Sequence, residues 1–111
     1  MKSNKIKNKK FSICIYDEID KLINAKRVFF VKISKGETKG NHGHYIQNQI
    51  FFCIDGSLAI KLKGKINEDL EISSDEYVYL PKETWISYTA IKDSYICVIS
   101  DQYYDENDYY Y

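Results

Sequence analysis

Residues 36–49 read GETKGNHGHYIQNQ and hold both histidines of the chain, His42 and His44. Glycines punctuate this stretch, and Gly56 closes it. Residues two apart on a strand point to the same face, so we expect both imidazoles to lie side by side on one face. Neutral imidazole is the side chain best suited to move a proton near neutral pH. The segment therefore predicts a site for proton transfer.

Outward from this segment, the chain consists of short apolar or alternating runs separated by turn residues. Leu58, Ile60 and Leu62 alternate with polar or small residues, as in a half-buried strand. Asp55-Gly56 before them is a hairpin-turn signal. A short helical turn is expected over residues 18–23. Strands are expected over residues 11–16, 27–33, 49–54, 58–63, 70–73, 77–80, 85–91 and 95–100. This spacing predicts an all-β antiparallel sandwich or barrel.

Length and charge narrow the class of protein. The 111 residues suffice for a single domain, which we expect to span residues 1–111. Sixteen basic residues balance sixteen acidic ones, so no overall field favours nucleic acid or a membrane surface. The longest uncharged apolar run, residues 50–54, is far too short to span a bilayer, and the N-terminus lacks the apolar region of a signal peptide. We expect a cytoplasmic protein without nucleic-acid or membrane partners.

The three cysteines fit a cytoplasmic protein. Cys14, Cys53 and Cys97 each lie among apolar residues, and their number is odd. They are interpreted as reduced core thiols. A Cys-x-x-Cys pair for zinc is lacking from the sequence. A nucleophilic pair of a cysteine with a histidine is the alternative that the sequence leaves open.

The histidine segment also resembles a known family. Its spacing, Gly-x5-His-x-His-x4-Gln-x6-Gly, is similar to the first signature of cupin barrels. Residues 11–109 resemble the sugar 3,4-ketoisomerases of the WxcM-like cupin family. The matching pieces are Arg27–Phe30, Lys39–His44, Gln49, Gly56-Ser57, Tyr79–Pro81 before Trp85, and the tail SDQYYDENDY at residues 100–109. The resemblance implies a small antiparallel β-barrel, or jelly roll, of the RmlC-like cupin type.

The resemblance also implies an activity. These enzymes convert a thymidine-diphosphate-linked (dTDP-linked) 4-keto-6-deoxyglucose into its 3-keto isomer, on the way to 3-amino sugars of bacterial surface glycans. His44 would be the principal base and His42 its helper, while Arg27 and Lys39 would meet the pyrophosphate. The other implied substrate-binding residues are Gln49, Phe29 and Trp85. Trp85 is open to two interpretations, a core aromatic beside a turn or an aromatic at the mouth of the barrel. The resemblance further implies a homodimer that pairs strands between subunits, with residues 11–16 as the exchanged strand.

Several positions depart from the family pattern. The family commonly has His where this chain has Ile86, the position at which metal cupins place their third histidine. Gln49 replaces the carboxylate of the metal-binding signature, and two imidazoles with an amide make a poor metal set. We expect neither a metal nor a cofactor. Phe29 stands in a strand that often carries a tyrosine, and Lys39 and Gly43 stand where the family has Arg and Ala.

Two functions of different classes therefore stay open: the isomerase, and a non-catalytic cupin module that binds a nucleotide sugar or dimerises. A 3,5-epimerase on a similar substrate is a weaker third, because that cupin family is longer and lacks the acidic, tyrosine-rich tail.

Overall fold

Antiparallel strands make up most of the protein, here described from a computed structural model that covers residues 4–7 and 12–111. Phe11, where the first expected strand begins, lies outside the described residues. The expected helical turn is a short 3-10 helix. The elements are β1 (Asn4–Lys7), β2 (Ser12–Ile15), η1 (Ile19–Lys21), β3 (Arg27–Ile33), β4 (Thr38–His44), β5 (Gln49–Gly64), β6 (Glu68–Ser73), β7 (Tyr77–Leu80), β8 (Thr84–Ser100), η2 (Glu106–Asp108) and β9 (Tyr109–Tyr110).

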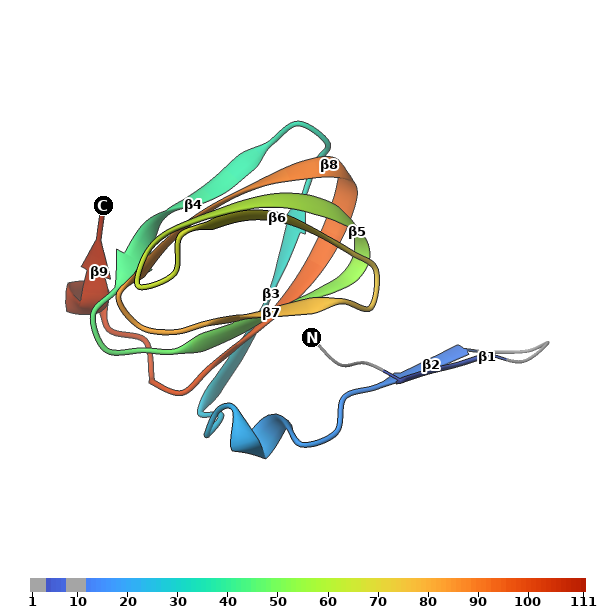
Figure 1. The fold of residues 1–111 in the computed structure, drawn as a ribbon, viewed down its shortest axis with the longest axis horizontal. Coiled ribbons are helices and arrows are strands. Elements are labelled where there is room, and N and C mark those ends of the chain that lie inside the picture. Colours follow the sequence, from blue (N-terminus) through green and yellow to red (C-terminus); the bar gives the residue numbers. More distant parts are fainter. Residues whose placement is uncertain (1–3, 8–11) are drawn as a thin grey trace.

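Two long strands, β5 and β8, form the centre of the barrel. They pair antiparallel along their whole length, from Gln49 opposite Ser100 to Gly64 opposite Thr84. At the end with Gln49 and Ser100, β7 pairs with β5 and β3 pairs with β8. At the end with Gly64 and Thr84, β6 pairs with β5 and β4 pairs with β8. The two half-sheets share β5 and β8 and fold over one another (Figure 1). The predicted all-β antiparallel barrel is confirmed.

The hairpin turn expected at Asp55-Gly56 is wrong. β5 continues through these residues, and its pairing with β8 shifts register between Cys53 and Leu58. Gly56 has a φ of 108°, and a side chain there would collide with Ser94 on β8. Glycine thus bends two paired strands at one point, which wraps the sheet into a barrel without ending either strand. The two strands expected over residues 85–91 and 95–100 are likewise one continuous β8.

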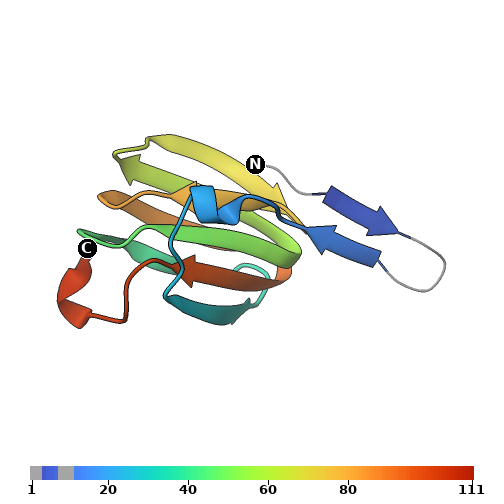
Figure 2. The same ribbon diagram turned by 90° about the horizontal axis from the view of Figure 1, so that it is seen from below.

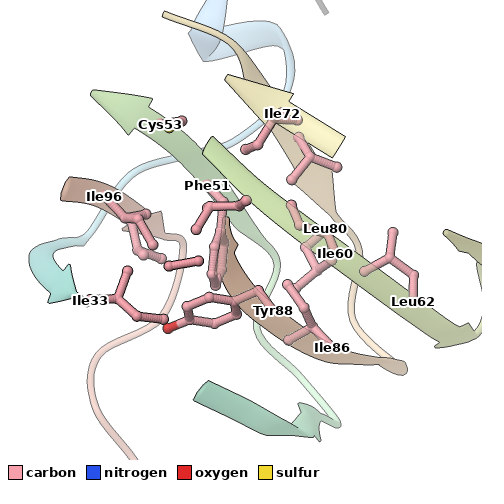
Figure 3. Packing of buried hydrophobic residues seen from close by; sticks show 14 residues of the cluster. Ile33, Phe51, Cys53, Ile60, Leu62, Ile72, Leu80, Ile86, Tyr88 and Ile96 are labelled. Carbon is pink, nitrogen blue, oxygen red and sulfur yellow. The ribbon is translucent and has the colours of Figure 1, made fainter. Parts of the chain in front are cut away.

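The main core fills the space between the half-sheets. Side chains of β8 alternate between inward and outward, so that Ile86, Tyr88, Ile96 and Val98 are buried. Phe51 from one half-sheet meets Tyr88 from the other edge-on, with ring centroids 5.5 Å apart (Figure 3). Aromatic and branched side chains of this size each contribute about 1.5–3 kcal/mol when fully buried. This packing holds β4 and β3, which carry the histidines and Arg27, in fixed positions.

The outer face of the β3–β8–β5–β7 half-sheet is partly covered by the N-terminal segment. Tyr16, Ile19 and Ile23 pack on Phe52 and its neighbours, and the Tyr16 hydroxyl donates to the Asp75 carbonyl at 2.7 Å. Ahead of this segment, β1 and β2 pair with each other and with no other strand of the described residues, and they extend away from the barrel (Figures 1 and 2).

All three cysteines are free thiols. Within the described residues, no helix has the length and apolar character needed to cross a membrane.

Candidate active site

The two histidines lie side by side on β4, as the sequence predicts. His44 is only 3% exposed, and His42 is half-buried. Their ring centroids are 5.0 Å apart and nearly perpendicular, at 81°. His42 lies opposite Ile86, a core residue of β8, so the imidazoles belong to the inner face of the barrel. Two proton carriers thus meet at one place within the fold.

The C-terminal tail closes this end of the barrel. Tyr109 and Tyr110 form β9, which pairs with His44 and Gly43 of β4. The Tyr109 ring lies 4.9 Å from the His42 ring and 4.4 Å from the His44 ring, centroid to centroid. At its start the tail is fixed by Asp101, whose carboxylate accepts from the Asn48 amide at 2.7 Å. The aromatic tail is thus a wall of the histidine site.

The sequence analysis matched the tail that contains Asp108 but predicted no role for Asp108 itself. It is 4% exposed, and its carboxylate accepts from the backbone N–H groups of Ile46 at 2.7 Å and Gln47 at 3.2 Å. Its Oδ2 lies 3.8 Å from Nδ1 of His44, close enough for an ion pair when the imidazole is protonated. The distance is too long for a hydrogen bond, so the buried carboxylate acts through its charge, which favours a proton on Nδ1.

Gln47, also missed by the sequence analysis, connects several of the predicted site residues. It is 1% exposed, and its Nε2 donates to Asp108 at 3.3 Å. Its Oε1 accepts from Arg27 Nη2 at 3.1 Å, from Gln49 Nε2 at 2.7 Å and from Ser100 Oγ at 2.8 Å. One buried amide therefore links β3, β5 and β8 to the tail that contacts His44.

Arg27, Gln49 and Phe29 belong to this cluster. The Arg27 guanidinium lies over the Phe29 ring at 5.1 Å and over the Tyr104 ring of the tail at 5.6 Å. Its Nε is buried and has no hydrogen-bond partner among the described residues. Nδ1 of His44 is likewise buried without a hydrogen-bond partner among these residues. Arg27 therefore keeps a donor within the site, which suits an anionic or carbonyl ligand. Beyond Asp108, residues of the tail and Ile46 line a cavity of about 290 Å³.

The two remaining predicted site residues lie on opposite faces of the barrel wall, Lys39 on the inner face and Trp85 on the outer face. Lys39 lies opposite the core residue Tyr88, on the same inner face of β4 as His42, and pairs with Glu37 at 3.5 Å. Trp85 precedes the inward Ile86, so it faces the outer side of the sheet, where Lys63 lies over its ring at 5.3 Å. The structure does not bring Trp85 into the histidine cluster, and the barrel-mouth interpretation fails on the alternation of the strand.

The metal positions of a cupin are occupied by other groups. Ile86 is 1% exposed within the core, and the Gln49 amide donates to Gln47. Across residues 4–7 and 12–111, no cluster of three or more His, Cys, Asp or Glu side chains has the arrangement to hold a metal ion.

Gly43, between the histidines, leaves room for the Tyr110 ring, which would collide with a side chain there.

Burial controls the protonation of His44. Desolvation and the neighbouring His42 lower the pKa of His44 from 6.5 to about 4, against an opposing effect of Asp108. His44 is therefore neutral near pH 7, the state that a base requires. Its second ring nitrogen can then accept a proton while Nδ1–H faces Asp108.

The pKa of His44 predicts how stability depends on pH. Between pH 6.5 and about 4 the unfolded chain binds a proton at His44 that the folded protein does not. The free energy of unfolding should therefore fall as the pH falls through this window, and be unaffected by this group above it. Urea unfolding at pH 7 and pH 5 should show a larger drop for the wild type than for His44→Asn. Equal drops in the two proteins would show that His44 has an ordinary pKa in the folded state.

Comparison with known proteins identifies the family. The sequence model of the WxcM-like, C-terminal (FdtA) family matches residues 2–111. The chain belongs to this family. The resemblance to this family, based on the histidine segment and the tail, is therefore confirmed.

Proteins similar to this chain include sugar isomerases. A TDP-4-oxo-6-deoxy-α-D-glucose-3,4-oxoisomerase from Aneurinibacillus thermoaerophilus is 30% identical over 90 residues, 78% of this chain; the match spans 65% of that relative's length. The crystal structure of QdtA, a sugar 3,4-ketoisomerase from Thermoanaerobacterium thermosaccharolyticum in complex with TDP, is 27% identical with a TM-score of 0.84, covering 98% of this chain and 83% of QdtA.

The wider fold class is also matched. A dTDP-4-dehydrorhamnose 3,5-epimerase from Bacillus anthracis has a TM-score of 0.82 at 11% identity, covering 96% of this chain and 73% of the epimerase. At that identity the likeness concerns the fold alone. The predicted RmlC-like cupin barrel is confirmed.

Proposed function

We propose that this protein is a 3,4-ketoisomerase that acts on TDP-4-keto-6-deoxyglucose and moves the keto group from C4 to C3. The observation that carries the proposal is the pair of contacting imidazoles inside a barrel of this family, with a buried carboxylate behind one of them. The names of the relatives agree with this substrate: QdtA was crystallised with TDP, and a variant of it with one histidine replaced by asparagine was crystallised with TDP-4-keto-6-deoxyglucose. The product would feed the synthesis of 3-amino sugars for surface glycans.

The chemistry needs proton transfers and no external oxidant. The proton on C3 is acidic because it is alpha to the C4 carbonyl. In the proposed mechanism neutral His44 removes this proton, and an enediolate forms across C3 and C4. A proton then passes from the C3 oxygen to the C4 oxygen with the help of His42. His44 finally returns its proton to C4, which leaves a ketone at C3 and restores both imidazoles.

The remaining residues of the cluster support binding rather than proton transfer. Arg27 offers unused guanidinium donors to the pyrophosphate or to a sugar oxygen. Phe29 lies against Arg27 and provides an apolar wall. Lys39 lies on the inner face of β4 and supplies a second cation for the pyrophosphate, once its contact with Glu37 is exchanged. Gln49 is held by Gln47 and shapes the floor. Because Gln49 and Ile86 stand at the metal positions of cupins, we propose that no metal takes part.

Two positions favour the second candidate, a module that binds the nucleotide sugar without converting it. Ile86 is buried in the core where the family commonly has His, and Phe29 lacks the hydroxyl of the family tyrosine. Neither residue can donate or accept a proton.

An activity assay with TDP-4-keto-6-deoxyglucose separates the two candidates. Appearance of the 3-keto sugar supports the isomerase. Binding of TDP in calorimetry without any conversion supports the module, and the restoring variants Ile86→His and Phe29→Tyr would then be tested for a gain of activity. An outer-surface variant, Trp85→Phe, is the control, because its ring lies on the other side of the sheet.

We also propose that the protein is a cytoplasmic homodimer. Among the described strands, the β1–β2 hairpin pairs with no other strand of its own chain. Apolar side chains of the nearby sheet face, Val28, Phe30 and Ile54, are more than 40% exposed. A second copy could cover this face with the strand that contains β2.

Sedimentation tests the dimer. At micromolar concentration the expected mass is twice the 13.1 kDa of one chain. Replacing the exposed Phe30 by Lys should shift the equilibrium toward monomer, whereas Lys61→Glu, on the outer face of the other half-sheet, should not. A monomer mass for the wild type would contradict the dimer.

A further inference from the structure

The protonation pattern of His42 follows from one contact with the backbone. Nδ1 of His42 lies 2.9 Å from the carbonyl oxygen of Gly40. A carbonyl oxygen only accepts hydrogen bonds, so Nδ1 must carry the hydrogen. In a neutral imidazole the other nitrogen, Nε2, then has a free lone pair. The contact therefore selects one of the two tautomers.

A β-bulge makes this contact. The pairing of β4 with β8 shifts register between Gly40 and His42, and two successive residues take the left-handed conformation: Gly40 with a φ of 89° and Asn41 with a φ of 59°. A side chain on Gly40 would lie 2.8 Å from the Ile86 carbonyl oxygen, so glycine is required there. Asparagine is among the few other residues that tolerate this region. The bulge thus turns the chain so that the carbonyl of residue 40 meets the ring of residue 42.

Neighbouring rings hold the imidazole in this position. The Tyr109 ring lies 4.9 Å from the His42 ring on one side, and the His44 ring lies 5.0 Å away. A ring flip would replace Nδ1 by a carbon atom at the Gly40 carbonyl and lose the hydrogen bond in a half-buried site. The orientation of the ring is therefore fixed by the bulge and by the tail together.

We propose that the Gly40 carbonyl is a positioning group that keeps His42 as the Nδ1–H tautomer, so that Nε2 alone carries out its proton transfers. This inference rests on the proposed isomerase. In the enediolate, Nε2 takes the proton of the C3 hydroxyl, and the resulting imidazolium keeps its Nδ1–H on the Gly40 carbonyl. Nε2–H then gives its proton to the C4 oxygen. One nitrogen accepts and donates in turn, the ring does not rotate, and no proton is gained or lost.

The tautomer can be measured directly in the substrate-free protein. The chain has only two histidines, so labelling histidine with ¹⁵N gives two imidazoles, and His44→Asn leaves that of His42 alone. Long-range ¹H–¹⁵N correlation spectra at pH 7.5 should show a protonated Nδ1 and a lone-pair Nε2 for His42, in a single form. A protonated Nε2, or an averaged mixture of tautomers, would overturn the proposal.

Variants of Asn41 test the role of the bulge. Asn41→Gly suits a φ of 59° and should keep the single Nδ1–H form. Asn41→Val is a β-branched residue in a region it avoids; it should give a mixture of tautomers and a kcat lower by about tenfold, with KM little changed. An Asn41→Val variant that keeps the single tautomer would show that the bulge is not the cause of the tautomer. If that variant fails to fold, the spectra of the wild type and of Asn41→Gly still decide whether His42 has the single Nδ1–H form. Because these spectra need no substrate, a locked tautomer in a protein that does not isomerise would count against the proposed function and not against this inference.

Discussion

Replacing His44 by Asn should reduce turnover by about a hundredfold or more, the largest functional effect that we expect of any single change. Asn keeps a polar group near the position of Nδ1, facing Asp108, but removes the nitrogen that would take the proton from C3. The change affects the chemical step, so the affinity for TDP in calorimetry should stay close to that of the wild type. His44 is buried, so thermal unfolding must accompany the assay to show that the variant is folded.

His42→Asn is the matched comparison. It lies two residues away on the same face of β4, and a solvent proton can partly replace a shuttle between two oxygens. We therefore expect a smaller loss of turnover than for His44→Asn. A reversed order of the two effects, or wild-type turnover in His44→Asn, would show that the roles are assigned wrongly.

Replacing Asp108 by Ala should cause the largest loss of stability among the site residues, about 3–5 kcal/mol. The change leaves the backbone N–H groups of Ile46 and Gln47 and the Gln47 side-chain amide without their acceptor, and both Gln47 groups are buried. Such a loss is a large fraction of the total stability of a small domain, about 5–15 kcal/mol. Urea unfolding at pH 7 measures it.

Two further variants separate charge from hydrogen bonding. Asp108→Asn keeps one acceptor oxygen and should cost less stability, but it removes the carboxylate that opposes the lowering of the His44 pKa. Its turnover should fall by about tenfold or more, because His44 becomes a weaker base. Glu106→Gln, an exposed change in the same short helix, should alter the free energy of unfolding by less than about 0.5 kcal/mol. A loss in Glu106→Gln as large as in Asp108→Ala would show that the tail is sensitive to any change of charge.

Much of the barrel follows from local alternation in the sequence. The expected strands over residues 27–33 and 77–80 coincide with β3 and β7, because branched and aromatic residues in these runs have turn residues on both sides. The continuity of β5 could not be predicted in the same way. Asp-Gly has the same local signature in a tight turn and in a strand bend, and only the contact of Gly56 with Ser94 across the sheet distinguishes them.

The histidines of the site were predictable, whereas their partners were not. His42 and His44 are close in sequence, and their two-residue spacing fixes a common face. Asp108 reaches His44 only because β9 pairs with β4, a contact that joins residues more than sixty positions apart. Trp85 could have been placed correctly, since its neighbour Ile86 is apolar and inward, and consecutive residues of a strand face opposite sides.

The most direct test of the account is carbon NMR of ¹³C-labelled TDP-4-keto-6-deoxyglucose mixed with the purified protein in D₂O. The account predicts that the keto resonance leaves C4 and appears at C3, and that deuterium enters the product at C4 to the extent that the proton on His44 exchanges with solvent before its return. Neither change should occur at a comparable rate with His44→Asn. A keto resonance that stays at C4 while the nucleotide sugar is bound would contradict it.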